Sequence, residues 1–174
     1  MGVILKNPNN IPTFRWMIPI AGYRSNATAT ATAGRVYMAL VEIPFPVVVD
    51  GIQNYNYATV AGNVTVGLYK AIVEDDPTGA VLIASSASTA MAGANAVQFI
   101  AFTSAVYLTP GRYYLAAEYS DGTATFGSSA ISAPLIQNSL AYYNRGGGYG
   151  ALTDPCPAIT LLTAQNGYVL RVKA

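Results

Sequence analysis

The stretch Asn-Val-Thr-Val-Gly-Leu-Tyr-Lys-Ala-Ile-Val at residues 63–73 decides the fold. Apolar residues take every second position from Val64 to Leu68, which is the period of a strand with one face in a core. Residues 74–79, Glu-Asp-Asp-Pro-Thr-Gly, then have the composition of a turn. Residues 80–87 have the pattern of the returning strand, so this part of the chain predicts an antiparallel hairpin.

The same pattern extends in both directions along the chain. No segment carries a sustained apolar period of 3.6 residues, so no helix is predicted. The pair Asp50-Gly51 is typical of a bulge or tight turn, and residues 123–126 are expected to form the hairpin partner of 112–119. Further strands are predicted at residues 35–43, 46–57, 96–103, 105–108, 112–119, 139–143 and 167–173. About eight strands at this spacing indicate an all-β, two-sheet antiparallel sandwich of jelly-roll type, with a barrel as the alternative.

Residues 1–34 differ from the rest of the chain. They begin with an Asn- and Pro-rich stretch and end in alternating Ala and Thr from residue 27 to 33, with nothing bulky to pack. One interpretation of the Ala/Thr stretch is a flexible linker, and the other is an extended arm that pairs with a neighbouring subunit. We therefore divide the chain into an extended N-terminal arm (1–34) and a β-sandwich domain (35–174). In the arm, we expect Phe14, Trp16 and Ile18 to contribute to assembly.

Composition excludes several classes of function. The chain has 174 residues, of which only 10% are charged, and its net charge is +1. A nucleic-acid protein needs a basic surface, so no nucleic-acid partner is expected. The uncharged run from Pro77 to Gly111 is long enough to span a bilayer, but its serines, threonines, glycines and prolines indicate strands and turns. We expect no membrane insertion.

Catalytic and metal-binding chemistry lack their usual residues. There is no histidine and only one cysteine, Cys156, which lies between two prolines. A polysaccharide hydrolase would need two facing carboxylates, for which Glu42 and Glu118 are the strand-borne candidates. A turn with Glu74, Asp75 and Asp76 is a weak calcium candidate, although such acidic tips are ordinarily solvated. We expect neither an enzyme nor a cofactor.

Tyrosine is abundant, with 13 residues in the chain. Tyr142, Tyr143 and Tyr149 surround Arg145 and a run of three glycines. Tyrosine offers a large contact area with a polar tip, which suits a recognition loop for a partner or a glycan. Alternatively, the segment is a strand end followed by a turn whose tyrosines pack back onto the domain.

Residues 36–126 resemble a sandwich domain of the structural proteins of tailed bacteriophages, found in tail fibres, head fibres and decoration proteins. The resemblance lies in Tyr-Met-Ala-Leu-Val (37–41), Val-Asp-Gly-Ile (49–52), Val-Thr-Val-Gly-Leu-Tyr (64–69) with its acidic turn, and Leu-Thr-Pro-Gly-Arg-Tyr-Tyr-Leu-Ala (108–116). It covers about half of the chain, and residues 1–34 and 127–174 have no counterpart in it. Such domains are also similar to carbohydrate-binding modules.

The resemblance implies a non-enzymatic virion protein, displayed on a phage capsid or tail and held by other virion proteins. The low charge agrees with this, because uncharged strand edges need a neighbour to cover them. We expect a homo-oligomer, with a trimer favoured. The alternative function is a receptor- or carbohydrate-binding module for host attachment, with a host-surface glycan as ligand.

Overall fold

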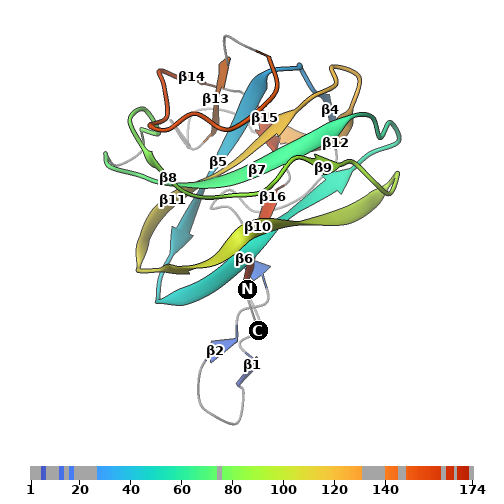
Figure 1. Cartoon of the computed structure of the whole chain (residues 1–174). Coiled ribbons are helices and arrows are strands. Elements are labelled where there is room, and N and C mark those ends of the chain that lie inside the picture. Colours follow the sequence, from blue (N-terminus) through green and yellow to red (C-terminus); the bar gives the residue numbers. More distant parts are fainter. Residues whose placement is uncertain are drawn as a thin grey trace.

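Two antiparallel β-sheets packed face to face make up the body of the protein (Figure 1). The computed structural model describes residues 5–6, 12–13, 16–17, 27–73, 76–130, 140–144, 148–161, 164–166 and 168–172. The all-β sandwich predicted from the sequence is confirmed. The described residues contain no helix that is long and apolar enough to cross a membrane.

In the part of the chain that the structure describes, each sheet has seven strands, and we name the sheets after their central strands. The β5 sheet has the order β14 (Thr160–Leu161), β13 (Leu140–Asn144), β5 (Arg35–Ile43), β11 (Gly111–Tyr119), β7 (Asn63–Lys70) and β8 (Val81–Ser85), with β9 (Thr89–Ala90) also paired to β7. The β6 sheet has the order β15 (Ala164–Asn166), β12 (Thr125–Ala130), β6 (Val47–Asn56), β16 (Tyr168–Val172) and β3 (Trp16–Met17), with β10 (Ala96–Leu108) paired to β6 and β4 (Ala27–Thr30) paired to β12. Two further strands, β1 (Leu5–Lys6) and β2 (Pro12–Thr13), pair with each other in a separate two-stranded sheet.

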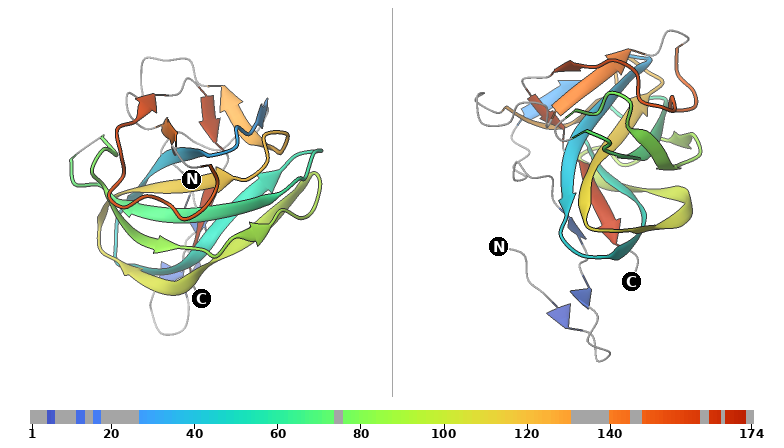
Figure 2. Two further views of the ribbon diagram at one scale, coloured as in Figure 1. Left: turned by 45° about the horizontal axis from the view of Figure 1, so that its top comes forward. Right: turned by 90° about the vertical axis from the view of Figure 1, so that its left-hand side faces the viewer.

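Two antiparallel segments of the chain stay paired as they cross from one sheet to the other, which gives the sandwich its jelly-roll character. Ile43 at the end of β5 pairs with Gly111 of β11, and Val47 at the start of β6 pairs with Leu108 of β10. The chain therefore passes from one sheet to the other at the same place twice, through residues 44–46 and 109–110. We call this place the corner. The right-hand view of Figure 2 looks onto that side of the molecule.

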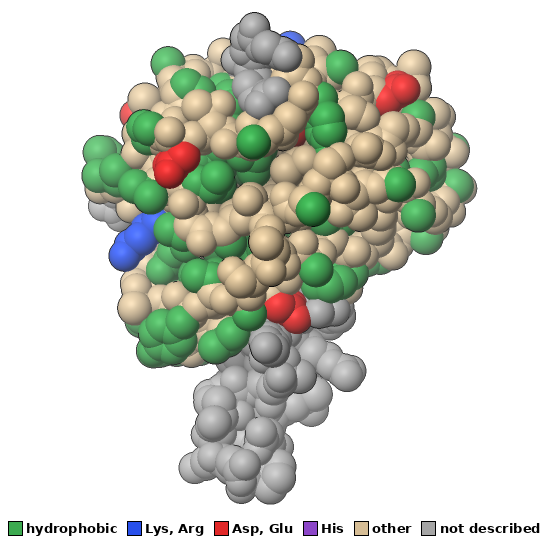
Figure 3. Space-filling view, viewed as in Figure 1, with side chains coloured by type: hydrophobic (Ala, Val, Ile, Leu, Met, Phe, Trp, Pro, Cys, Tyr) green, Lys and Arg blue, Asp and Glu red, His purple; other side chains and the backbone are tan. Residues whose placement is uncertain are grey.

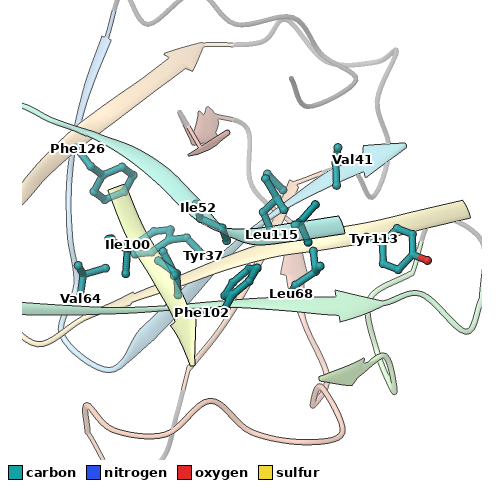
Figure 4. Close-up of a cluster of buried hydrophobic side chains, with 14 of the residues drawn as sticks. Tyr37, Val41, Ile52, Val64, Leu68, Ile100, Phe102, Tyr113, Leu115 and Phe126 are labelled. Carbon is teal, nitrogen blue, oxygen red and sulfur yellow. The ribbon is translucent and has the colours of Figure 1, made fainter. Parts of the chain in front are cut away.

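The main core lies between the two sheets. Side chains at alternating positions of β7, such as Val64 and Leu68, meet Ile52 of β6 and Ile100 of β10 (Figure 4). Tyr119 and Phe126 stack at one end of this core, with ring centroids 4.8 Å apart. The alternation seen in residues 63–70 therefore separates the side chains of the main core from those on the outer face of the β5 sheet.

A second core covers the outer face of the β5 sheet. Val36, Met38 and Leu40 of β5 point away from the main core and are buried. They are packed with Leu152 and Cys156 of residues 148–159, which we call the covering segment. Strand β5 is thus apolar on both faces, as a strand buried between two layers has to be.

The Ala/Thr stretch belongs to the sandwich. Strand β4 pairs with β12, and the Ala31 amide donates a hydrogen bond of 2.8 Å to the Ala124 carbonyl. Ala31 is itself buried in the main core. Strand β4, which lies in the segment that the sequence assigned to the arm, is therefore paired within the β6 sheet.

Two finer expectations have different outcomes. A bulge at Asp50 is confirmed, because the pairing of β6 with both β10 and β16 steps from Val49 to Gly51. The hairpin expected between residues 112–119 and 123–126 is wrong. Strand β11 lies in the β5 sheet and β12 lies in the β6 sheet, because the turn at Asp121 carries the chain across the sandwich.

Candidate docking surface

Tyr143, one of the predicted recognition residues, lies inside the second core. Its side chain is 2% exposed, and its hydroxyl is 3.0 Å from that of Tyr69. The Thr153 amide donates to the Tyr143 hydroxyl, and the Tyr69 hydroxyl donates to the Thr153 carbonyl at 2.7 Å. Burial raises the pKa of both tyrosines, so both stay neutral. This pair holds the covering segment against the β5 sheet.

Tyr149 is also tied to the sheet. Its hydroxyl lies 2.7 Å from Oγ1 of Thr65 and 2.8 Å from Oγ of Ser88. The backbone of Tyr142 pairs with Tyr37 in the sheet, while Arg145 lies outside the described residues. Tyr143 and Tyr149 therefore each bind the covering segment to the rest of the domain at a different place, in agreement with the second interpretation, in which these tyrosines pack back onto the domain.

The remaining predicted residues are placed only in part. Trp16 lies in β3 opposite Arg171, whereas Phe14 and Ile18 are outside the described residues. Glu74 and Asp75 are outside them as well, and Asp76 accepts a hydrogen bond from the Thr78 amide at 2.8 Å. Within the part of the chain that the structure describes, no three acidic or cysteine residues gather as metal ligands would.

Glu42 and Glu118 do not face each other. In the pairing of β5 with β11, Glu42 is opposite Arg112 and Glu118 is opposite Val36. Six residues along a strand separate the two carboxylates by about 20 Å. Glu118 is buried and accepts a hydrogen bond from the Gly150 amide at 3.3 Å. This pair does not have the spacing of about 5–10 Å that a glycosidase needs.

Cys156 has the environment of a structural residue. Its side chain is buried, and burial raises the pKa of the thiol to about 12. Its backbone joins the edge of the β5 sheet, because the Cys156 amide donates to the Ala80 carbonyl and the Gly79 amide donates to the Cys156 carbonyl. A neutral thiol is a poor nucleophile, so this arrangement does not equip Cys156 for catalysis.

Exposed apolar side chains gather at the corner. The described residues include six large hydrophobic side chains that are exposed, and five of them are near this end of the sandwich. Tyr107 and Val48 are cross-strand partners next to the corner on the β6 sheet. The others lie beside the corner on the β5 sheet, around the end of β7. We call the whole group the corner surface; it consists of Val48, Ile72, Val73, Val81 and Tyr107, with the exposed prolines Pro44, Pro46 and Pro110.

The view in Figure 3 shows hydrophobic side chains along the left and lower-left margin of the molecule, where Figure 1 places the corner. Ile72 is 65% exposed and Tyr107 is 62% exposed. Single exposed hydrophobic residues are normal on a protein surface, but a cluster of them marks an interaction site. The prolines restrict the backbone of the corner, so this surface has little freedom to lose on binding.

A groove lies within this region on the β5-sheet side. It has a volume of about 380 Å³ and is lined by Glu42, Ala71, Ile72, Val73, Gly111 and Arg112. The Ala71 amide donates to the Arg112 carbonyl at 3.2 Å, which fixes the lip formed by Ile72 and Val73 against β11. Glu42 and Arg112 are cross-strand partners on the opposite wall. Among the described residues, the lining of the groove thus combines one acid, one base and two exposed aliphatic side chains.

Sequence reasoning missed the corner surface. The signal was present in the prolines at 44, 46 and 110 and in the Ile-Val pair just before the acidic turn. The sequence does not show the pairing that brings these distant segments to one end. Comparison with known proteins gives no match to any family model and no match to a curated protein.

Proposed function

We propose that this chain is a non-enzymatic structural protein of a virion, a β-sandwich displayed on a phage capsid or tail and held by protein–protein contacts. The observation that carries the proposal is the corner surface, where five of the six exposed large hydrophobic side chains of the described residues lie at one proline-containing end of the sandwich. A free monomer gains nothing from such a surface, whereas an assembled protein buries it.

The composition supports the same proposal. Charged residues make up 10% of the chain, against about 25% in a typical soluble domain. Charge keeps proteins soluble and monomeric, so a chain with few charged residues is suited to an assembly with other proteins. The partners proposed are other virion proteins and further copies of this chain, with a trimer as the expected oligomer.

The N-terminal arm is the proposed second point of anchorage. Strands β1 and β2 pair with each other and lie apart from the two sheets (Figure 1), and a lone pair of such short strands is marginally stable in water. A partner that binds Phe14, Trp16 and Ile18 would hold this arm in place. Because β4 is part of the sandwich, the test deletes residues 2–26, which include the two-residue edge strand β3, and keeps residues 27–34. We expect this variant to fold and to fail to enter the particle.

The test of the corner surface uses a charged variant with a matched control. The chain is produced together with the other structural proteins of its virion, and its copy number per purified particle is measured. Ile72→Glu with Val73→Glu should reduce incorporation at least tenfold. Val97→Glu is the control for Val73→Glu alone, because it places one glutamate at a valine that is 56% exposed, against 57% for Val73, and lies far from the corner; it should be incorporated normally. Normal incorporation of the double variant would remove the main support for the proposal.

A receptor- or carbohydrate-binding module is the second candidate. The half-buried rings of Tyr55 and Tyr57 lie on the outer face of the β6 sheet, with centroids 5.2 Å apart and planes at 84°. Neighbouring aromatic rings at a surface are the usual platform for a sugar ring, because its C–H face packs on them. A glycan array probed with the wild type and with Tyr57→Ala tests this function. A signal that is lost in the variant supports it, and no signal from the wild type contradicts it.

A further inference from the structure

We propose that two copies of this chain bind each other through the open edge of β10, so that their β6 sheets form one continuous antiparallel sheet. The contact has two-fold symmetry, with Val97 of each copy opposite Ala101 of the other. The inference rests on the proposed role in assembly and adds to it a specific partner, a second copy, and a contact away from the corner surface.

The edge strands β8 and β10 differ in how their backbones are covered. At the start of β8, the Ala80 carbonyl accepts a hydrogen bond of 2.9 Å from the Cys156 amide. One step further, the Leu82 amide donates to Oδ1 of Asp154 at 3.0 Å, so the covering segment closes this edge. In the part of the chain that the structure describes, β10 pairs with β6 alone (Figure 1). The chain therefore covers one edge of the sandwich and leaves the other open.

The geometry of β10 shows which of its backbone groups point to the open side. A Cβ added at Gly51 of β6 would collide with the Ile100 carbonyl oxygen, so this carbonyl points toward β6. Successive residues of a strand turn their amides and carbonyls to opposite sides. Val97 and Ala101 are each an odd number of residues from Ile100, so their amides and carbonyls point away from β6.

The open edge is complementary to a second copy of itself. The amides and carbonyls of Val97 and Ala101 have no hydrogen-bond partner among the described residues. A strand in this state offers donors and acceptors in alternation to any strand that lies beside it. A two-fold axis between two antiparallel copies of β10 places Val97 against Ala101 at both ends of the contact. Each of these pairs then exchanges both of its backbone hydrogen bonds.

The side chains along this edge also permit the pairing. Val97 is 56% exposed, and Ala101 is exposed on the same face of the sheet. A β-branched side chain opposite a small one packs without a clash between neighbouring strands. Charged residues are the usual protection of an open edge, and residues 77–111 contain none. Two copies therefore meet here without repulsion between like charges.

The open part of the edge is short. The pairing of β10 with β6 is interrupted by a bulge after Ala101. Within this bulge, Oγ1 of Thr103 donates to the Ser85 carbonyl at 2.9 Å and ties β10 to β8. The contact between copies is thereby confined to residues 96–101. Such a contact is at the low end of specific interfaces, so we expect an association that depends on concentration.

Hydrogen exchange on the full chain detects the added strand without any substitution. The amides of Val97 and Ala101 should exchange more slowly as the protein concentration rises from about 10 µM to about 1 mM. The amides of Gln98 and Ile100, which point toward β6, should exchange slowly at every concentration. Residue-resolved mass spectrometry measures both sets. Exchange at Val97 and Ala101 that is independent of concentration would overturn the inference.

A charged edge tests the register of the contact by light scattering after size exclusion. The wild type should reach twice the chain mass of 18.2 kDa, or double the mass of a smaller oligomer, at concentrations on the order of 100 µM. Val97→Glu combined with Ala101→Glu places like charges directly opposite each other at both ends. This double variant should show half the wild-type mass.

Val97→Glu alone is the matched control. Its glutamate is opposite the neutral Ala101, and the two glutamates of a pair are about 13 Å apart along the strands. This distance exceeds the screening length of about 8 Å at physiological salt, so the single variant should keep the wild-type mass. A single variant that falls as far as the double variant would contradict the pairing of Val97 with Ala101.

Mixing variants of opposite charge separates a lost contact from a lost fold. Val97→Lys combined with Ala101→Lys should also show half the wild-type mass. When this variant is mixed with the double glutamate variant, each lysine is opposite a glutamate, and the mixture should recover the wild-type mass. Unfolded variants would not recover it, and thermal unfolding checks that each variant is folded.

Two results of the mass measurements would overturn the inference: a wild type with the same mass as its double glutamate variant, or a mixture that stays at the reduced mass. Neither result bears on incorporation into the particle. If the copies fail to pair while Ile72→Glu with Val73→Glu still blocks incorporation, the proposed function stands without the inference.

Discussion

Tyr143 shows that a tyrosine of a recognition surface and a tyrosine that holds a buried segment in place cannot be told apart in the sequence. Tyr143 stands next to a glycine run and an arginine, as a recognition residue would. In the folded chain its ring is buried, and its hydroxyl links Tyr69 to the covering segment. The register of β13 on β5 decides which purpose Tyr143 serves. Tyr143 is opposite Val36, and both side chains lie on the face of the β5 sheet that the covering segment buries.

Loss of the Tyr143 hydroxyl should therefore weaken the fold. In Tyr143→Phe the Thr153 amide loses its acceptor in a partly buried site, which costs about 1–2 kcal/mol of unfolding free energy. Urea denaturation of the wild type and the variant measures this loss.

The matched control is Tyr107→Phe, which removes a hydroxyl from a side chain that is 62% exposed. Its unfolding free energy should stay within about 0.5 kcal/mol of the wild type. Equal stability of Tyr143→Phe and the wild type would contradict the role given to the tyrosine pair.

At the scale of elements, the period of hydrophobic residues was a good guide to where strands lie. The predicted strand at 35–43 agrees with β5, and the hairpin of residues 63–87 agrees with β7 and β8. Strand β4 was missed because Ala and Thr carry no strong period, and it exists because β12 offers an edge to pair with. The covering segment was missed because residues 148–159 form no regular element, so burial on the sheet alone gives them their place.

Gly67 makes room for the covering segment. A Cβ atom at this position would collide with Cδ1 of Leu152 and would lie 3.1 Å from Cδ1 of Leu82. Gly67→Ala should therefore cost about 1–3 kcal/mol of stability through overpacking. Chemical denaturation of the single and double variants measures it, and the loss should be less than additive in Gly67→Ala combined with Leu152→Ala.

Gly122→Ala is the control for this comparison. The nearest atom to a Cβ at Gly122 is 3.8 Å away, which is an ordinary contact. We expect this variant to be close to the wild type in stability. A strictly additive double variant at Gly67 and Leu152 would show that the two residues do not compete for the same space.

For the whole molecule, the second core makes the free energy of unfolding decrease at alkaline pH. The pKa of Cys156 is raised from 9.0 to about 12 in the folded chain, and the pKa values of Tyr69 and Tyr143 are raised as well. Between the unfolded and folded pKa values, the folded chain holds protons that the unfolded chain has released. Its stability is therefore complete below about pH 9 and falls as the pH rises above that value.

Urea denaturation from pH 7 to pH 11 follows this loss. Cys156→Ala should remove the part of the slope that begins near pH 9 and leave the part that tyrosines add above about pH 10. Alkylation of Cys156 in the native chain should also be slow at pH 9, because the thiol is buried and protonated. A stability that does not change up to pH 11 would rule out the neutral second core.

The corner imposes a rule on where this chain can be lengthened. Residues 44–46 and 109–110 turn side by side, and each ribbon keeps its register with the other on both sides of the turn. One residue inserted into either segment would shift β6 against β10 and turn inward side chains outward, unless its partner segment were lengthened to match. A foreign peptide should instead be grafted into the exposed residues 92–94, between β9 and β10, where the chain can grow without changing how any two strands align.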